Sequence, residues 1–408
     1  MRSALLLALT AAPTAAFADS FQVAFEDAPV RERPDAAAPM LGTLAAYVRL
    51  PRLAGSEGPG CDGPWIAIQP EGFVCSEMLR ASPREPHRPD LLSVPAGKVL
   101  PYRYGFARRS GARLYVRPGD PDSVEPVRTL DAGFGLGLRH LVRVHDRFVW
   151  RTVSGRYVLD DELRHARPIE FEGLRIPKGE RPDVGWTFAA TTPVVPDAGA
   201  QRWNAIATLE TRTRVEVLEE TAVDDVAFLH VRFEPVRRFP RLPAVAEGWV
   251  KAAAVRRASY APVPEEIREK ERWIDVDLAN QTLVAWDGDV PAFATIVSTG
   301  RWSRTTPRGV HRIHSKYARA TMDDEDPLGD SSPYALEDVP WVQYFAGGVG
   351  FHAAFWHAAF GYRVSHGCVN LAPNDARFLY SWTAVPVPPG WTARFATERE
   401  PGTVVRVR

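Results

Sequence analysis

Neither sign of charge predominates in this sequence of 408 residues, because 50 Lys and Arg residues balance 50 Asp and Glu residues. The balance excludes a general electrostatic attraction to nucleic acid or to an anionic membrane. No stretch after residue 18 approaches the roughly 20 consecutive apolar residues of a membrane span, so no integral membrane segment is predicted. Cysteine is also scarce, with only three residues, at positions 61, 75 and 368.

The first 18 residues have the composition of a signal peptide. Arg2 supplies the charged start, residues 4–9 supply a short apolar run, and Ala16-Phe17-Ala18 supplies the small-residue end. Cleavage after Ala18 leaves Asp19 first, and no cysteine follows it to carry a lipid anchor. We therefore expect a soluble protein exported to the periplasm or cell wall.

Cys368 is the candidate nucleophile. It lies in Ser365-His366-Gly367-Cys368-Val369-Asn370, and His352 lies 16 residues upstream. A thiol attacks as thiolate, and a nearby imidazole both accepts the proton and stabilises the charge. If residues 366–368 form an extended strand, the His366 and Cys368 side chains point to the same face. Two histidines therefore compete for the role of base.

Two other interpretations of this cluster remain open. Cys368 could be a small buried apolar side chain, because free cysteine is often interior. A zinc site built from His352, His357, His366 and Cys368 uses permissible ligand types, although their spacing matches none of the usual zinc-finger patterns. The sequence gives no sign of a required metal or organic cofactor.

These residues resemble the L,D-transpeptidase (YkuD) catalytic domain family. The resemblance rests on His352, the block 365–370, and four upstream blocks in the same order. The upstream blocks are Ile274–Leu278, Gln281–Leu283, Val297–Gly300 and Thr306–Ile313. Ordered blocks at family-like spacing are more specific than one His-Gly-Cys motif. They cover roughly the last third of the chain, and we place the domain at residues 272–408.

The resemblance implies a role for each matching residue. Cys368 is the acyl-accepting nucleophile, His352 its general base, and His366 a supporting residue. Backbone N–H groups around Gly367 and Cys368 are the expected oxyanion donors. Gly367 lets the backbone approach the substrate closely. The residue after His352 is alanine, where relatives more often have glycine or serine; a backbone carbonyl from Ala353 would orient the imidazole equally well.

Further residues are expected at the substrate groove by the same resemblance. The segment from Lys316 to Tyr334 resembles a polar, loop-like flap that covers the substrate. Together with the motif block and the segment after His352, it supplies the predicted substrate-binding residues, which are Ser365, Asn370, Tyr317, Met322 and Trp356. Trp356 could equally be an ordinary core residue.

The region between the signal peptide and the catalytic domain shows weak internal repetition. An aromatic-Val step recurs at Phe73, Tyr157 and Trp249, each after a short apolar stretch, as in bacterial SH3-like barrels. We predict SH3-like domains at 19–81 and 184–260, and a less regular one at 100–170. Pro- and charge-rich linkers are expected at 82–89 and 175–182.

The expected fold is therefore mainly β: a β-rich YkuD-type domain with a short helix, preceded by two or three small SH3-like barrels. The clearest helix is predicted at Asn374 to Trp382, after Pro373. Residues 264–270 could form one or two further helical turns instead of a linker.

Export bears on the two remaining cysteines. An oxidising compartment makes a disulfide between Cys61 and Cys75 plausible, and closure of so short a loop would stabilise the fold by about 3 kcal/mol. Cys368 is then left unpaired, and an unpaired thiol in an exported protein favours the nucleophile interpretation.

Three functions are consistent with these residues. The first is a transpeptidase that joins peptidoglycan stem peptides by 3→3 cross-links through a thioester on Cys368, and that reacts with carbapenems. The second is an L,D-carboxypeptidase or amide hydrolase in which water resolves the thioester. The third is a non-catalytic cell-wall-binding protein with a degenerate catalytic domain. The SH3-like domains would bind peptidoglycan or act as spacers.

Overall fold

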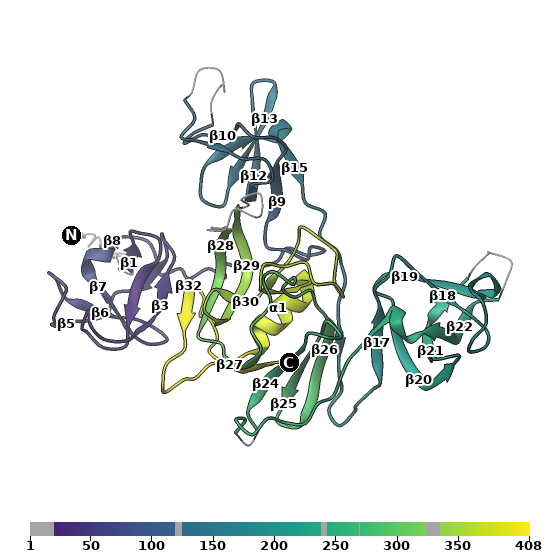
Figure 1. The fold of residues 1–408 in the computed structure, drawn as a ribbon. Helices are drawn as coiled ribbons and strands as arrows, with labels where there is room; N and C mark the ends of the chain where they lie inside the picture. Colours follow the sequence, from purple (N-terminus) through teal and green to yellow (C-terminus); the bar gives the residue numbers. More distant parts are fainter. Residues whose placement is uncertain (1–19, 119–124, 238–242, 269, 324–334) are drawn as a thin grey trace, which may run out of the picture. The chain divides into compact units, whose positions relative to one another are not determined.

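The computed structural model describes residues 20–118, 125–237, 243–268, 270–323 and 335–408 (Figure 1). The signal peptide predicted at residues 1–18 lies outside the described residues. The chain divides into two compact units. One contains the residues up to Leu91 together with Pro388–Thr392, and the other contains Leu92–Val387 with Ala393–Arg408. None of the helices in the described residues is long and apolar enough to cross a membrane.

The first unit is built from short antiparallel strands. They form the sheets β4-β1-β8 and β3-β2-β7-β6-β5. The elements are β1 (Ser20–Val23), β2 (Ala28–Arg31), β3 (Met40–Leu44), β4 (Arg49–Pro51), β5 (Gly55–Ser56), β6 (Trp65–Ala67), β7 (Phe73–Cys75), the 3-10 helix η1 (Ser76–Met78) and β8 (Leu79–Ser82). A disulfide joins Cys61 to Cys75 and closes a loop of 14 residues.

A second set of strands follows at residues 103–165. Its main sheet has the order β15-β9-β12-β13-β14, and β10 pairs with β11. The elements are β9 (Arg103–Ala107), β10 (Ala112–Leu114), β11 (Arg128–Leu130), β12 (Gly135–Val144), β13 (Arg147–Thr152), β14 (Tyr157–Leu159), η2 (Asp160–Glu162) and β15 (Leu163–His165). We call residues 103–165 the middle β region.

A third set of strands spans residues 184–257. Its main sheet is β22-β21-β20-β17-β23, with β18 paired to β19. The elements are β17 (Val184–Thr187), β18 (Thr191–Val194), η3 (Arg202–Asn204), β19 (Ala207–Glu210), β20 (Arg214–Val223), β21 (Val226–Val236), β22 (Val245–Lys251), η4 (Ala252–Ala254) and β23 (Val255–Arg257). Alternation of apolar and polar residues in β20 buries Val215 and Val217 and leaves Glu216 exposed.

The three regions close with the same order of elements. A strand, a 3-10 helix and a final strand occur as β7-η1-β8, β14-η2-β15 and β22-η4-β23. The aromatic-Val steps at Phe73, Tyr157 and Trp249 lie in the first strand of each closing motif. This regularity extends to the middle β region, where the sequence pattern is weakest. The SH3-like assignment and its boundaries stay predictions.

Among its described residues the C-terminal domain contains two sheets and one α-helix, which lies against β29 and β30 (Figure 1). One sheet has the order β16-β26-β25-β24-β33-β27, and the other contains β32, β28, β29, β30 and β31 as successive neighbours. The elements are β16 (Leu174–Arg175), β24 (Arg272–Asp277), β25 (Thr282–Asp287), β26 (Val290–Ile296), β27 (Gly309–Arg312), β28 (Ser315–Asp323), β29 (Ala335–Ala346), β30 (Val349–Ala353), β31 (Val369–Leu371), α1 (Pro373–Trp382), β32 (Trp391–Phe395) and β33 (Val404–Val407).

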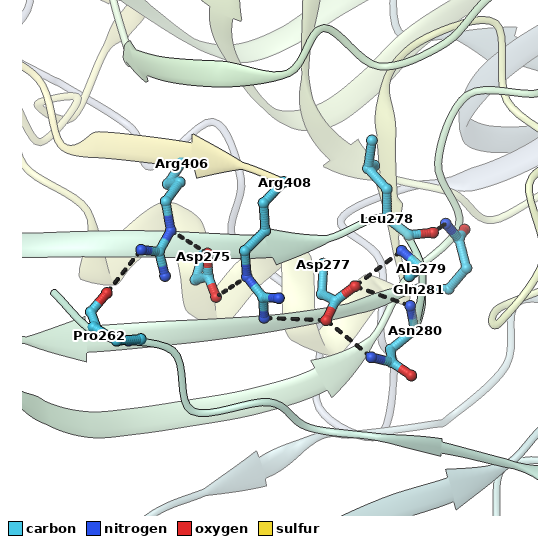
Figure 2. A network of polar contacts seen from close by, with 9 residues as sticks. All are labelled: Pro262, Asp275, Asp277, Leu278, Ala279, Asn280, Gln281, Arg406 and Arg408. Atoms are coloured by element: carbon cyan, nitrogen blue, oxygen red, sulfur yellow. Dashed lines mark hydrogen bonds and ion pairs between the residues drawn. The ribbon is translucent and has the colours of Figure 1, made fainter. Parts of the chain in front are cut away.

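A buried polar network joins the last strand to the first strand of this domain (Figure 2). Asp275 on β24 is 1% exposed and accepts hydrogen bonds from Arg406 (2.7 Å), on the parallel strand β33, and from Arg408 (3.0 Å), which follows that strand. Asp277 accepts from the backbone N–H groups of Ala279 and Asn280 and so closes the turn between β24 and β25. The positive charges of Arg406 and Arg408 pair with the Asp275 carboxylate and offset the cost of burying it.

Helix α1 is anchored at both ends. Pro373 occupies its first turn, where a missing N–H costs nothing. Asp375 is fully buried and accepts hydrogen bonds from the Gly173 N–H (2.8 Å) and the Thr295 hydroxyl (2.5 Å). At the other end the Lys316 ammonium donates to the Tyr380 carbonyl (2.7 Å), where a cation is favoured by the helix dipole.

Local structure departs from expectation in three places. Residues 264–268 form turns rather than a helix, because the hydrogen bonds from Ile267 to Pro264 and from Glu271 to Arg268 are isolated turns. The predicted linker at 175–182 begins inside β16, which pairs with β26. The segment expected to be a loop-like flap begins as strand β28, because its β-branched and aromatic residues complete a sheet with β29. Residues 324–334 of that segment lie outside the described residues.

Candidate active site

Two parallel strands bring the candidate nucleophile and base together. Strand β30 pairs with β31, with Phe351 opposite Val369 and His352 opposite Asn370. Cys368 immediately precedes β31. Cys368 lies two positions before Asn370, the residue opposite His352, so the pairing brings the segment that holds Cys368 to the strand that holds His352. Sequence separation alone does not produce this juxtaposition; the parallel pairing does.

The Cys368 thiol is partly buried and is the one free thiol, since the other two cysteines form the disulfide. Its Sγ lies 3.7 Å from the carbonyl oxygen of Gly348. Burial raises the pKa of the Cys368 thiol, and the backbone N–H of Gly350 acts in the opposite direction. The resting group at neutral pH is therefore the protonated thiol, which requires a base before it can attack.

His352 is 2% exposed. Its ring stacks on Trp356 with centroids 5.5 Å apart and an interplanar angle of 20°. Burial lowers the pKa of His352 to about 4, so the ring is neutral at pH 7 and able to accept a proton. Nδ1 lies 3.4 Å from the carbonyl oxygen of Ala353. A carbonyl only accepts, so Nδ1 carries the proton and Nε2 is the free acceptor.

The turn before Cys368 is fixed by Ser365. Its hydroxyl donates to the Cys368 carbonyl (2.5 Å) and accepts from the Gly367 N–H (3.2 Å). Gly367 has φ +125°, a conformation that side-chain-bearing residues rarely adopt, and its carbonyl accepts from the Thr306 hydroxyl (2.7 Å). The Gly367 N–H is thus engaged, whereas no hydrogen bond from the Cys368 N–H occurs within the described residues; its part as an oxyanion donor stays a prediction.

His366 does not follow the extended geometry considered from the sequence. Residues 366–368 form a bend rather than a strand, because Gly367 reverses the backbone. The His366 Nε2 lies 2.9 Å from Nη2 of Arg301. A guanidinium only donates, so this nitrogen accepts and the proton of the neutral ring is on Nδ1. His366 is thereby held by Arg301, which sequence reasoning missed.

Asn370 is buried and its side-chain amide lies 2.8 Å from Nε2 of His357. Its backbone exchanges hydrogen bonds with Ser298 in both directions. Burial lowers the pKa of His357 to about 4, so this ring is also neutral. Asn370 therefore joins the β31 strand to the His357 segment, and its predicted contact with substrate stays a prediction.

The remaining predicted substrate residues lie on two elements. Tyr317 on β28 is opposite Val342 and packs edge-on against Tyr344 and Phe395. Met322, further along β28, is opposite Leu336 and packs on the core. Trp356 follows β30 and covers His352. Ring stacking places Trp356 at His352, whereas nothing joins Met322 to His352 in the described residues.

A buried glutamine supports the site from the first hairpin of the domain. Gln281 Nε2 donates to the Leu278 carbonyl (2.8 Å) and the Thr299 hydroxyl (2.7 Å), and its Oε1 accepts from the Thr299 N–H (2.9 Å). The Thr299 carbonyl in turn accepts from the Ser365 N–H. Figure 2 shows Gln281 beside the turn that Asp277 closes. Gln281 and Thr299 both lie in sequence blocks that resemble the family, but the sequence does not show that the two residues are hydrogen-bonded.

The zinc interpretation has no support from the geometry. Within the described ranges, the one grouping of at least three candidate ligands is Cys61, Cys75 and Glu77. The two sulfur atoms of that group form a disulfide and are not thiolate ligands. The four residues considered from the sequence, His352, His357, His366 and Cys368, do not form such a group.

Comparison with known proteins identifies the C-terminal domain. Residues 271–407 match the model of the L,D-transpeptidase catalytic domain (YkuD). L,D-transpeptidase 1 of Mycobacterium tuberculosis is 37% identical over 93 residues, which are 22% of this chain and 37% of that protein. L,D-transpeptidase 2 of the same species is 34% identical over 89 residues, which are 20% of this chain and 22% of that protein.

The catalytic domain of an E. faecium L,D-transpeptidase matches with 26% identity and a TM-score of 0.27, covering 35% of this chain and 100% of that one. The same comparison holds for that domain acylated by ertapenem. The chain spans between about a fifth and little more than a third of the length of these curated relatives.

Proposed function

Because residues 271–407 form a YkuD-type L,D-transpeptidase catalytic domain, we propose that this chain is an exported cysteine acyltransferase acting on the peptide stems of peptidoglycan. The single observation that carries the proposal is the parallel pairing of β30 and β31, which brings the strand of a neutral His352 to the segment that holds the free thiol of Cys368. A neutral imidazole beside a protonated thiol is the starting state of general-base activation.

The first half-reaction is acylation. His352 takes the thiol proton at Nε2 as Cys368 Sγ attacks the carbonyl carbon that follows the third residue of a tetrapeptide stem. The Cys368 N–H donates to the developing oxyanion. The bond from that carbon to the nitrogen of the terminal D-alanine breaks, and the leaving amine takes the proton from His352. The product is a thioester on Cys368 and free D-alanine.

The second half-reaction resolves the thioester. A side-chain amine of a second stem attacks the thioester carbon, transfers a proton to His352 and forms an amide. The carbon–sulfur bond breaks, and the sulfur regains its proton. The product is a 3→3 cross-link between stems, whereas attack by water would yield only a shortened stem.

One other feature supports this assignment, and two further proposals follow from it. The Cys61–Cys75 disulfide fits an oxidising compartment outside the cytoplasm. The three N-terminal β regions are proposed to be SH3-like domains that bind the wall or hold the catalytic domain at a distance from it. Ser365 and Gly367 are proposed to shape the turn that presents Cys368, and His366 to act with Arg301 behind it.

The test is intact-mass analysis after incubation with a disaccharide-tetrapeptide, comparing the wild-type protein with Cys368→Ala. A 3→3 dimer formed only by the wild type supports transpeptidation. A tripeptide without dimer indicates the carboxypeptidase, and absence of any product or adduct that depends on Cys368 contradicts the proposal. Incubation with a carbapenem measures the fraction of protein with a reactive thiol as a mass increase, because the protein has a single free cysteine.

A further inference from the structure

A cavity of about 680 Å³ lies at the base of the middle β region, away from Cys368. Its walls are residues 95–104, the segment Leu138–His140 of β12 and residues 165–170. This volume falls in the range of about 300–1,000 Å³ that is usual for small-molecule sites. Its charged and aromatic lining residues are Lys98, Arg103, Arg139, Glu170, Tyr102, Tyr104, His140 and His165, the last of which contacts Asp160 at 2.8 Å.

Cations outnumber carboxylates in this lining. The Arg139 guanidinium lies over the Tyr102 ring at 5.5 Å, and that of Arg103 lies over the Trp150 ring at 5.7 Å. In the part of the chain that the structure describes, neither these arginines nor Lys98 form an ion pair. Guanidinium groups held by aromatic faces keep their planar N–H forks available for a carboxylate.

The floor of the cavity connects to the catalytic histidine. Tyr104 is 2% exposed, and its ring stacks on Phe355 at 3.8 Å. Phe355 contacts Trp356 at 5.0 Å, and Trp356 stacks on His352. The Tyr104 hydroxyl also donates to the Asp338 carbonyl (2.7 Å) on β29. The cavity and the catalytic base are therefore joined by a continuous row of aromatic contacts.

We propose that this cavity binds the carboxylate-bearing peptide of a peptidoglycan stem, at a second site outside the thioester groove. The choice of a stem peptide as ligand rests on the proposed function, whereas the preference for a carboxylate rests on Lys98, Arg103 and Arg139 alone. A stem peptide presents several carboxylates, and its aliphatic parts match the apolar lining residues Val99 and Leu100. Occupancy would hold a stem beside the contacts that lead to His352.

The test measures binding of a disaccharide-tripeptide, which lacks the leaving D-alanine, to the full chain carrying Cys368→Ala. Calorimetry is repeated with Arg103→Gln plus Arg139→Gln, and with Lys98→Gln, whose side chain is exposed in a loop. Arg143→Gln is the matched control, because it also lies on β12 but does not line the cavity. Thermal melts verify that each variant is folded.

We expect the affinity to fall about tenfold or more in the double arginine variant and to a smaller extent in Lys98→Gln, with Arg143→Gln unchanged. Methyl esters of the tripeptide should bind as weakly to the parent as the free acid binds to the double variant. Equal affinity in all variants overturns the proposal. If the parent protein binds inorganic phosphate but does not bind the tripeptide, the carboxylate assignment is overturned. None of these outcomes depends on turnover, so failure of transpeptidation is detected separately by Cys368-dependent acylation.

Discussion

The pH dependence of Cys368 acylation tests the assignment of His352 most directly. Burial raises the thiol pKa above its ordinary value of 9.0 and lowers the pKa of His352 to about 4. At pH 7 less than about one thiol in a hundred is ionised, and about one imidazole in a thousand is protonated. In the proposed mechanism the reacting state is thus the neutral pair, and His352 is expected to remove the proton during attack.

The expected profile follows from these two values. The acylation rate with a carbapenem should be nearly constant between about pH 5 and 8. It should fall about tenfold per pH unit below pH 4, as His352 becomes protonated, and rise above pH 9 as free thiolate forms. His352→Ala should lower the rate at pH 7 by about 10²–10⁴-fold, because only thiolate then reacts, and its rate should increase tenfold per pH unit up to the thiol pKa.

The measurement is intact-mass kinetics from pH 3.5 to 10, with circular dichroism at each pH to verify folding. His145→Asn serves as control, because it removes an imidazole from an exposed turn of the middle β region. A half-maximal point near pH 6.5 in the wild type would show that His352 is not held neutral by burial. A wild-type rate from His352→Ala would remove it from the mechanism.

Three further predictions concern the framework of the site. Burial raises the pKa of Asp375 from 3.8 to about 7, so its stabilising contribution is complete below about pH 4 and is lost as the pH rises through 7, by up to about 4 kcal/mol. Asp375→Asn should therefore be more stable than the wild type at pH 8 and similar at pH 4.5 in thermal melts, and an identical pH dependence in both would contradict this. Gln281→Leu removes three buried hydrogen bonds and should destabilise the protein by about 2–4 kcal/mol in urea unfolding, with slower acylation of Cys368; unchanged unfolding and acylation would refute its positioning role. Replacing Cys61 and Cys75 by serine should lower the unfolding free energy of the first unit by about 3 kcal/mol and leave carbapenem acylation unchanged, which unfolding and mass analysis measure. Loss of acylation in that variant would show that the reactivity of Cys368 depends on the disulfide-bonded first unit, contrary to this prediction.

Local patterns were sufficient for much of the C-terminal domain. The predicted start at residue 272 is one residue from the family match at 271–407. The predicted helix at 374–382 agrees with α1 to within one residue, because Pro373 marks its first turn unambiguously. The mainly β character followed from alternating β-branched and aromatic residues. These features depend on neighbours within a few positions along the chain.

The sequence by itself therefore determined the family of the C-terminal domain, its nucleophile candidate and the types of residue around it. Only the tertiary structure decided how those residues are used. Parallel pairing of β30 with β31 brought the strand of His352 to the Cys368 segment, and the bend at 366–368 left His366 in contact with Arg301. Contact between Tyr104 and Phe355 crosses about 250 positions of sequence. Such contacts arise from the packing of distant segments, whose register and burial no local pattern encodes, and burial in turn sets which protonation state His352 holds.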